Sequence, residues 1–377
     1  MSVARERARR VTLRDVAVHA GVSVTTASFV LSGRHEMRIS AATEERVLQS
    51  ARMLDYRRRL VPDAAPPTGA PAIGLVSDVI ASEAFGGEMV RGCISAAAER
   101  GHVVLMADTE GVDELEDSAV RALVARGVDR FVYATMGTIV YRVPEVLRGF
   151  AVHGAGPSGR RGEPGPPTNR LVLMNNVDPQ TSVPSVIPDD HRAGRTAADT
   201  LVAAGHTGGI WLVGRVTADA YAAGKRLAGI KAALRARGLG LAGHVKCGWW
   251  PDQTRAAVSA LLSDGWWERD RPTAVIAMND RAAMGVYQAL AGAGLRIPDD
   301  VSVVSFDNSD LARWVHPGLS SLNLPYFDIG RRAVELLLDG APAKTHKLAM
   351  QLRERRSIGA PSRPAQAQRH DLEGAQP

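Results

Sequence analysis

The apolar positions between residues 12 and 33 predict two short helices joined by a tight turn, the layout of a helix-turn-helix. Thr12 and Asp15 have the spacing of a capping box, which marks the start of the first helix. Gly21 stands where the chain must turn sharply, and Ser23 can cap the second helix. The residues expected to face inward are Val16, Ala17, Ala20, Ala27, Val30 and Leu31.

This packing leaves Val24, Thr25, Ser28 and Phe29 on the outer side of the second helix. A recognition helix presents such side chains to the major groove of DNA. An ordinary helical hairpin has the same spacing, so the pattern alone leaves both interpretations open.

A third helix is expected from Ser40, because acidic residues near its start suit the helix dipole. The segment that follows, residues 56–71, contains four prolines and is predicted to be an extended linker. The buried stripe of the third helix is expected to consist of Val47, Leu48, Ala51 and Leu54.

From residue 72 onward, β-branched runs such as AIGLVSDV and TAVIAMN alternate with amphipathic stretches such as EMVRGCISAAAERG. This alternation predicts βαβ units, enough for two doubly wound parallel-sheet subdomains that bind ligands at the carboxyl ends of their strands. The Gly- and Pro-rich segment 154–170 and the tail 361–377 cannot bury a core and are predicted to be disordered.

A chain of 377 residues with 45% apolar content can bury two or three cores. Cys93 and Cys247 lie far apart and lack metal-type spacing, so we expect no disulfide scaffold, no metal and no cofactor. The N-terminus lacks an apolar signal region, and there is no 18-residue apolar run. A cytoplasmic location without membrane association is therefore expected.

The positive charge is concentrated at the N-terminus. Residues 1–60 hold twelve arginines, no lysine and six acidic residues, whereas residues 61–377 hold 34 basic and 34 acidic residues. A basic head on a neutral body is the electrostatic pattern expected of a DNA-binding protein. A solvated basic terminus would explain Arg5 to Arg10 alone, but not the coincidence of the charge with the helix-turn-helix pattern.

Several separated motifs resemble the LacI/GalR family of bacterial transcriptional regulators, over about residues 11–358. The segment VTLRDVAVHAGVSVTTASFVLSG resembles the helix-turn-helix of the family, and VPSVIPDDHRAGRTAADTLVAAGH, TAVIAMNDRAAMG and HPGLSSLNLP resemble parts of its body. The resemblance implies a homodimeric repressor on a pseudo-palindromic operator. It also implies a periplasmic-binding-protein-like body in which a sugar or related metabolite shifts operator affinity.

Composition and resemblance together set the expected domain limits. These are a helix-turn-helix domain at 1–56, a linker at 57–71, a first subdomain at 72–185 and 324–341, a second subdomain at 186–323 and 342–360, and a tail at 361–377.

By resemblance, Val24, Thr25 and Phe29 occupy base-reading positions, and the neighbouring hydroxyl residues suit phosphate contacts. Phe29 stands where the family usually has Arg, and it offers only apolar contact, such as contact with a thymine methyl. We therefore expect an operator read largely through thymine methyls and DNA shape. The expected DNA contacts are Thr12, Ser23, Val24, Thr25, Thr26, Ser28, Phe29, Arg57, Arg58 and Arg59.

The linker departs from the family pattern P-N-x-x-A-R-x-L, in which the Leu wedges into the minor groove. Asp63 and Ala65 stand at the Arg and Leu positions, and an alanine is too small to separate a base step. Leu60, one turn earlier, is an alternative wedge. These departures support a second hypothesis, a DNA-binding regulator whose effector response is lost or rewired.

The resemblance implies effector contacts at Arg195, whose donors suit hydroxyls or carboxylates, and at Asp280, which would accept bonds from sugar hydroxyls. Asp280 also suits the N-cap of the helix that follows it. Asp307 matches a family Asp near the ligand, although Ser305 replaces the usual Gly. Arg226 suits a ligand contact and an ion pair equally well.

Two aromatic residues, Phe85 and Trp249, are expected to line the effector site by resemblance, although core packing explains each of them as well. Leu324 takes a place where many relatives have a polar residue, which favours a ligand less hydroxylated than a common sugar. The chain lacks G-x-G-x-x-G after a strand, a phosphate-binding loop and a nucleophile elbow, so we expect no enzyme activity.

Overall fold

The chain divides into two compact units, residues 1–65 (the head) and residues 66–377 (the body). The hinge with Arg57, Arg58 and Arg59, the effector candidate Phe85 and the tail from residue 363 lie outside the described residues. The computed structural model describes residues 11–31, 39–54, 56, 69–80, 86–151, 154–156, 165–168, 170–217, 220–340 and 342–362.

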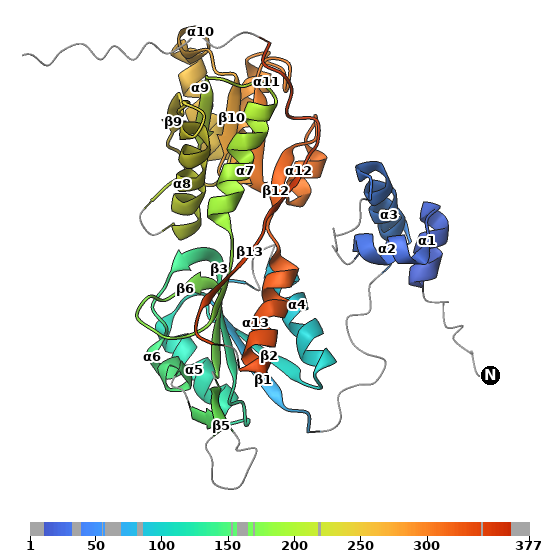
Figure 1. The fold of residues 1–377 in the computed structure, drawn as a ribbon, viewed down its shortest axis with the longest axis vertical. Coiled ribbons are helices and arrows are strands. Elements are labelled where there is room, and N and C mark those ends of the chain that lie inside the picture. Colours follow the sequence, from blue (N-terminus) through green and yellow to red (C-terminus); the bar gives the residue numbers. More distant parts are fainter. Residues whose placement is uncertain are drawn as a thin grey trace, which may run out of the picture. The chain divides into compact units, whose positions relative to one another are not determined.

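The head contains three described helices, α1 (Leu13–Ala20), α2 (Val24–Leu31) and α3 (Ala41–Met53) (Figure 1). The predicted capping box is confirmed, because the Thr12 N–H donates to Asp15 Oδ2 at 2.7 Å and the Asp15 N–H donates to Thr12 Oγ1 at 3.3 Å. Gly21 ends α1 with a φ of 65°, a conformation that glycine adopts without strain.

The core of the head confirms most of the predicted inward faces. Leu31, Leu48 and Leu54 are only partly buried at its margin. Ser50 was not predicted to be buried, but its hydroxyl lies 2.9 Å from His19 Nδ1. The fully buried apolar residues are Val16, Ala17, Ala20, Ala27, Val30, Val47 and Ala51.

The first sheet of the body has the strand order β13-β7-β6-β3-β1-β2, and its neighbouring strands run parallel. Helices α4 (Gly86–Glu99) and α13 (Tyr326–Asp339) cover one face, and α5 (Asp113–Val124) and α6 (Glu145–Ala151) cover the other. The strands are β1 (Ala72–Ser77), β2 (Val103–Asp108), β3 (Phe131–Val140), β6 (Leu171–Val177), β7 (Ser185–Pro188) and β13 (Thr345–Leu348).

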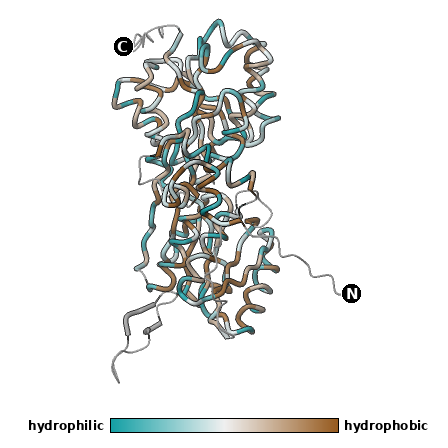
Figure 2. Tube along the Cα trace, turned by 90° about the vertical axis from the view of Figure 1, so that its right-hand side faces the viewer, coloured by the Kyte–Doolittle hydropathy of each residue, from teal (hydrophilic) through white to brown (hydrophobic). Residues whose placement is uncertain are grey.

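The second sheet has the order β14-β12-β11-β10-β8-β9, and β14 pairs antiparallel with β12 while the other pairs are parallel. Apolar clusters lie on both faces of each sheet. Figure 2 marks the hydrophobic segments of the body in brown. The strands are β8 (Ile210–Val213), β9 (Gly243–Val245), β10 (Ala274–Ala277), β11 (Ser302–Asp307), β12 (Ser320–Asn323) and β14 (Gln351–Arg353).

Two groups of helices cover the second sheet, and their apolar faces lie in separate clusters. The predicted pair of doubly wound parallel sheets is thus confirmed. No helix in the described ranges has the length and apolar character needed to cross a membrane. The first group is α7 (Asp190–Ala203) and α8 (Tyr221–Arg235), and the second is α9 (Pro251–Ser263), α10 (Trp266–Asp270), α11 (Asp280–Gly292) and α12 (Asp310–Trp314).

Two of the three crossings between the sheets fall later than the expected subdomain limits, whereas the limit at 323/324 agrees, because β12 ends at Asn323 and α13 packs on the first sheet. Strand β7 continues to Pro188, and β13 pairs with it in the first sheet, although residues 186–188 and 345–348 were expected in the second subdomain. Because residues 345–348 bond to residues 185–188, both segments belong to the first sheet.

The prediction of disorder for residues 154–170 is wrong at both ends of the segment. Strands β4 (Gly154–Gly156) and β5 (Gly165–Thr168) pair as a small antiparallel ribbon. The residues between these strands lie outside the described part of the chain.

Helices α7 and α8 approach each other at glycines. A Cβ at Gly229 would collide with the carbonyl oxygen of His191, whereas a Cβ at Gly224, on the same helix, would meet nothing within 4 Å. Gly229→Ala is therefore expected to lower the stability of the body by about 1–3 kcal/mol, because the helices must separate. Gly224→Ala is expected to raise it by roughly 0.5–1 kcal/mol through helix propensity. Thermal unfolding of both variants checks this, and shifts of equal sign would contradict it.

Candidate functional site

The outer side of α2 presents a small set of accessible groups. Val24 is 44% exposed, Thr25 is also exposed, and Ser28 and Phe29 are partly buried. Thr25 makes no side-chain hydrogen bond within the described part of the head. Its hydroxyl is therefore available to an external partner.

The other hydroxyl candidates of the head already have local partners. Ser23 caps α2 as predicted, since its Oγ accepts the Thr26 N–H at 3.0 Å and lies 2.8 Å from Thr26 Oγ1. The Thr12 hydroxyl donates to Asp15 at 2.7 Å. These bonds fix the start of each helix, so the sequence is locally consistent with the turn that orients α2.

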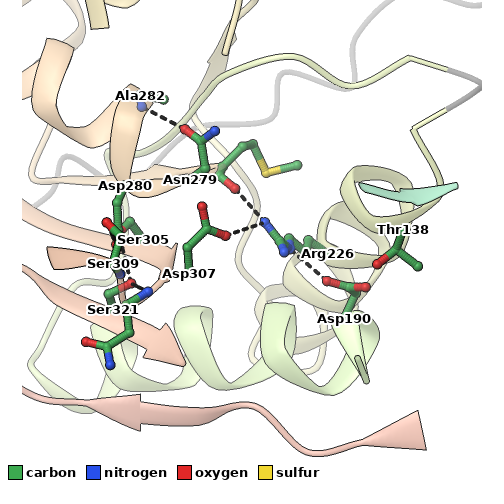
Figure 3. A network of polar contacts seen from close by, with 12 residues as sticks. Thr138, Asp190, Arg226, Asn279, Asp280, Ala282, Ser305, Asp307, Ser309 and Ser321 are labelled. Atoms are coloured by element: carbon green, nitrogen blue, oxygen red, sulfur yellow. Dashed lines mark hydrogen bonds and ion pairs between the residues drawn. The ribbon is translucent and has the colours of Figure 1, made fainter. Parts of the chain in front are cut away.

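In the body, the buried guanidinium of Arg226 joins α7 and α8 to the carboxyl ends of β10 and β11 (Figure 3). Arg226 on α8 donates to Asp190 Oδ1 at 2.8 Å and to the Met278 carbonyl at 2.7 Å, and it lies 3.9 Å from Asp307 Oδ1. It also stacks on the Phe306 ring, with the guanidinium carbon 4.6 Å from the ring centroid. The ion-pair interpretation of Arg226 is therefore the one seen in the structure. Asp190 is a partner that the sequence analysis did not identify.

Asp307 ends β11 in an unusual backbone conformation. Its φ is 105° and that of Asn308 is 51°, values that cost non-glycine residues about 1–3 kcal/mol each. Asn308 is held by Asn323 at 2.9 Å and by Arg355 at 2.6 Å. Burial raises the pKa of Asp307 to about 8, against the opposing effect of Arg226, and its carboxyl remains 14% exposed. Strain of this kind, imposed by surrounding contacts, is typical of ligand sites.

Asp280 is enclosed by serines. Its two carboxylate oxygens accept hydrogen bonds from the hydroxyls of Ser305, Ser321 at 2.7 Å and Ser309 at 2.8 Å, and from the Ser309 N–H at 2.6 Å. The side chain is 1% exposed, and burial raises the pKa of Asp280 despite these donors. Both oxygens are thus used in joining α11 to β11, α12 and β12.

The N-cap interpretation of Asp280 is wrong, because Asn279 caps α11 by accepting the Ala282 N–H at 2.7 Å. Ser309 and Ser321 were missed by the sequence analysis. The only signal for this enclosure was Ser305 in place of the usual Gly, because the other serines lie on later elements that the fold brings together.

The remaining effector candidates lie in different surroundings. Arg195 is exposed on α7 and has no hydrogen-bond or ion-pair partner within the described part of the body. Trp249 packs partly buried against the core beneath α7 and α8, and its carbonyl accepts from Asn279 at 3.5 Å. Leu324 is buried in the same core. No group of three His, Cys, Asp or Glu residues in the described ranges could hold a metal ion.

The raised pKa of Asp307 predicts a pH-dependent contribution to stability. The folded chain retains a proton that the unfolded chain releases near the ordinary aspartate pKa of 3.8, so this contribution is complete below about pH 4 and is lost as the pH rises towards 8. Asp307→Asn removes the titration. Its stability relative to wild type is expected to increase from pH 4 to 8, by at most about 1.4 kcal/mol per pH unit, and then to level off. Urea unfolding of both proteins across this range checks the difference, and a pH-independent difference would contradict it.

Comparison with known proteins agrees with both parts of this architecture. Residues 12–59 match the model of bacterial regulatory proteins, lacI family, and residues 176–358 match that of the periplasmic binding protein-like domain. The HTH-type transcriptional repressor PurR of Vibrio vulnificus (strain CMCP6) is 27% identical over 341 residues, which cover 89% of this chain and 93% of that protein. The sucrose operon repressor of Escherichia coli is 30% identical over 342 residues, which cover 87% and 93%.

Among solved structures, the complex of the transcriptional regulator CelR with cellobiose has a TM-score of 0.60 and 25% identity, and the match covers 92% of this chain and 100% of that one. The relatives named here are transcriptional regulators and not enzymes. With a matched helix-turn-helix, a matched ligand-binding-type body and a relative at 30% identity across nearly its whole length, this chain belongs to the LacI family and is a DNA-binding transcriptional regulator.

Proposed function

We propose that the protein is a cytoplasmic repressor that binds a pseudo-palindromic operator as a homodimer, and that a sugar or related metabolite bound to the body modulates its operator affinity. The observation that carries the DNA-binding part is the outer side of α2, where Thr25 is exposed and unpartnered while the helix start is fixed internally. Two heads on successive half-sites fit the geometry of helix-turn-helix dimers.

The composition of α2 supports a particular mode of base reading. Val24 and Phe29 offer apolar contact, which suits thymine methyl groups, and Thr25 offers a hydroxyl. Ser28 and Thr26, with Thr12, Ser23 and the three arginines at 57–59, supply phosphate contacts in this proposal. An arginine at position 29 would add about 1–3 kcal/mol of discrimination for guanine, which this chain forgoes.

For the effector, we assign direct contacts to Arg195, Asp307, Trp249 and, by resemblance, Phe85. Arg195 has free donors, and Asp307 is a strained, partly exposed carboxyl. Arg226 positions Asp307 from one side, with its guanidinium 3.9 Å from the Asp307 carboxyl. The relative named in complex with cellobiose supports a carbohydrate-like ligand.

Asp280 is assigned a different role, because serine donors already occupy both of its oxygens. It holds the turn at Ser309 next to Asp307. The same observation favours the second candidate function, a regulator that has lost its effector response, because the carboxylate expected to accept sugar hydroxyls is enclosed.

Operator reading can be tested with full-length protein on a duplex selected from a random pool. Replacing thymine by deoxyuracil at the selected positions removes only the methyl groups. When the same position is replaced in both half-sites, we expect operator affinity to fall about tenfold, in line with the 1–3 kcal/mol of a good base contact. Thr25→Ala is expected to abolish the preference for the selected sequence. Gln49→Ala, an exposed change on α3, is the matched control. An operator that tolerates deoxyuracil throughout would contradict the apolar reading.

Effector binding can be tested by thermal unfolding against mono- and disaccharides that include sucrose and cellobiose. A ligand that raises the unfolding temperature of wild type is expected to have no effect on Arg195→Ala, because the guanidinium would be lost. It should retain its effect on Arg192→Ala, which removes an exposed arginine from the same helix. Operator binding that no member of the panel changes would support the effector-independent candidate instead.

A further inference from the structure

The strands of the first sheet start at a single edge, and the chain from the head enters the body at this same edge. The register places Ala72, the first residue of β1, beside Val103 of β2. Gly74 lies beside Phe131 of β3, and Phe131 lies beside Leu171 of β6. Because these strands are parallel, the residues that precede each of them gather where the chain from the head arrives.

Basic residues occupy these preceding positions. The carbonyl of Arg130 accepts the Gly74 N–H at 2.9 Å, so Arg130, just before β3, lies beside β1. The carbonyl of Arg170 accepts the Phe131 N–H at 2.8 Å, so Arg170, just before β6, lies beside the start of β3. The Lys344 carbonyl accepts the Ser185 N–H at 3.1 Å at the start of β7. With the residues after α4 and α5, they form what we call the linker edge: Arg100, Arg126, Arg130, Arg170 and Lys344.

Within the described ranges, carboxylates pair with two of these five cations. Arg100 lies 2.8 Å from Asp339, and Arg170 lies 3.9 Å from Asp129, with all four side chains about half exposed. Pairs this exposed contribute little. The nearby Glu99 and Glu335 are matched by Arg331 and Arg332. Residues 61–377 carry no net charge as a whole, so the excess of cations over carboxylates at the linker edge is local to this surface.

Helix-end electrostatics explain only part of this excess. Arg100 and Arg126 follow the C-termini of α4 and α5, where a cation stabilises the helix dipole, and Arg130 reaches the Leu337 carbonyl of α13 at 3.4 Å. Arg170 and Lys344 instead precede strands and are exposed. Lys344 has no side-chain partner in the described part of the body.

We propose that the linker edge contacts the phosphates of the DNA that flanks the sequence held by the head. This inference rests on the proposed DNA-binding function. Tyr56 and Gly69 are thirteen residue steps apart, which span at most about 45 Å when fully extended and correspond to roughly 13 base pairs. A tether of this length allows the edge to reach phosphates next to the sequence held by the head. Its contribution is independent of base sequence, and it offsets the lack of an arginine on the outer side of α2.

The test compares full-length wild type with Arg126→Gln/Arg170→Gln/Lys344→Gln on a mixed-sequence duplex of about 40 base pairs, by fluorescence anisotropy between about 50 and 200 mM salt. Each lost phosphate contact is expected to reduce the slope of log K against log salt by about 0.9, hence by two to three for the triple variant, with affinity at low salt falling about tenfold or more. The matched control, Lys231→Gln/Arg235→Gln/Arg255→Gln, removes the same charge from exposed positions on α8 and α9 and should retain the wild-type slope.

The outcomes separate this inference from the function on which it rests. Wild type that fails to bind any duplex at low salt refutes the proposed DNA-binding function itself. Wild type that binds, with equal slopes for the edge and control variants, overturns only the linker edge. A changed oligomeric state of the edge variant with an unchanged slope also overturns it, by identifying a protein interface. If the triple variant does not fold, Lys344→Glu gives the same test, with an expected slope reduction of about one.

Discussion

The buried guanidinium of Arg226 is the contact on which the second sheet of the body and the helices that cover it depend. One side chain joins the start of α7 through Asp190, the end of β10 through the Met278 carbonyl and the end of β11 through Asp307. Removing one partner of such a buried pair leaves an uncompensated charge, at a cost of about 3–5 kcal/mol. The bond between Arg226 and Asp190 also holds α8 close to α7. The two helices can approach this closely only because glycines stand at their contact.

The carboxyls of Asp280 and Asp307 lie in different surroundings. Asp280 is completely satisfied by serine donors and acts as a joint between α11, α12 and two strands. Asp307 is held in a strained backbone, close to one cation and partly open, so that its charge state is sensitive to its surroundings. The protonation of Asp307 can therefore change with its surroundings, whereas Asp280 fixes the elements around it.

The structure of the head depends mainly on local interactions, and there the sequence was most informative. The capping box at Thr12 and Asp15, the glycine turn and the cap at Ser23 are local interactions within four residues, so each could be identified from spacing alone. The same holds for the inward faces of α1 and α2, because helical periodicity fixes which side chains share a face. The third helix was predicted less completely, since Ser50 is buried through its contact with His19 on another helix.

By itself, the sequence determined the helix-turn-helix, the alternation that builds two parallel sheets, and the concentration of charge in the first sixty residues, because each depends on local spacing or on composition. The tertiary structure alone decided that β13 completes the first sheet, that three serines from separate elements enclose Asp280, and that Arg226 on α8 pairs with Asp190 on α7. These outcomes join residues separated by tens to more than a hundred positions, and no periodicity in a single chain specifies which distant donor reaches a buried carboxylate.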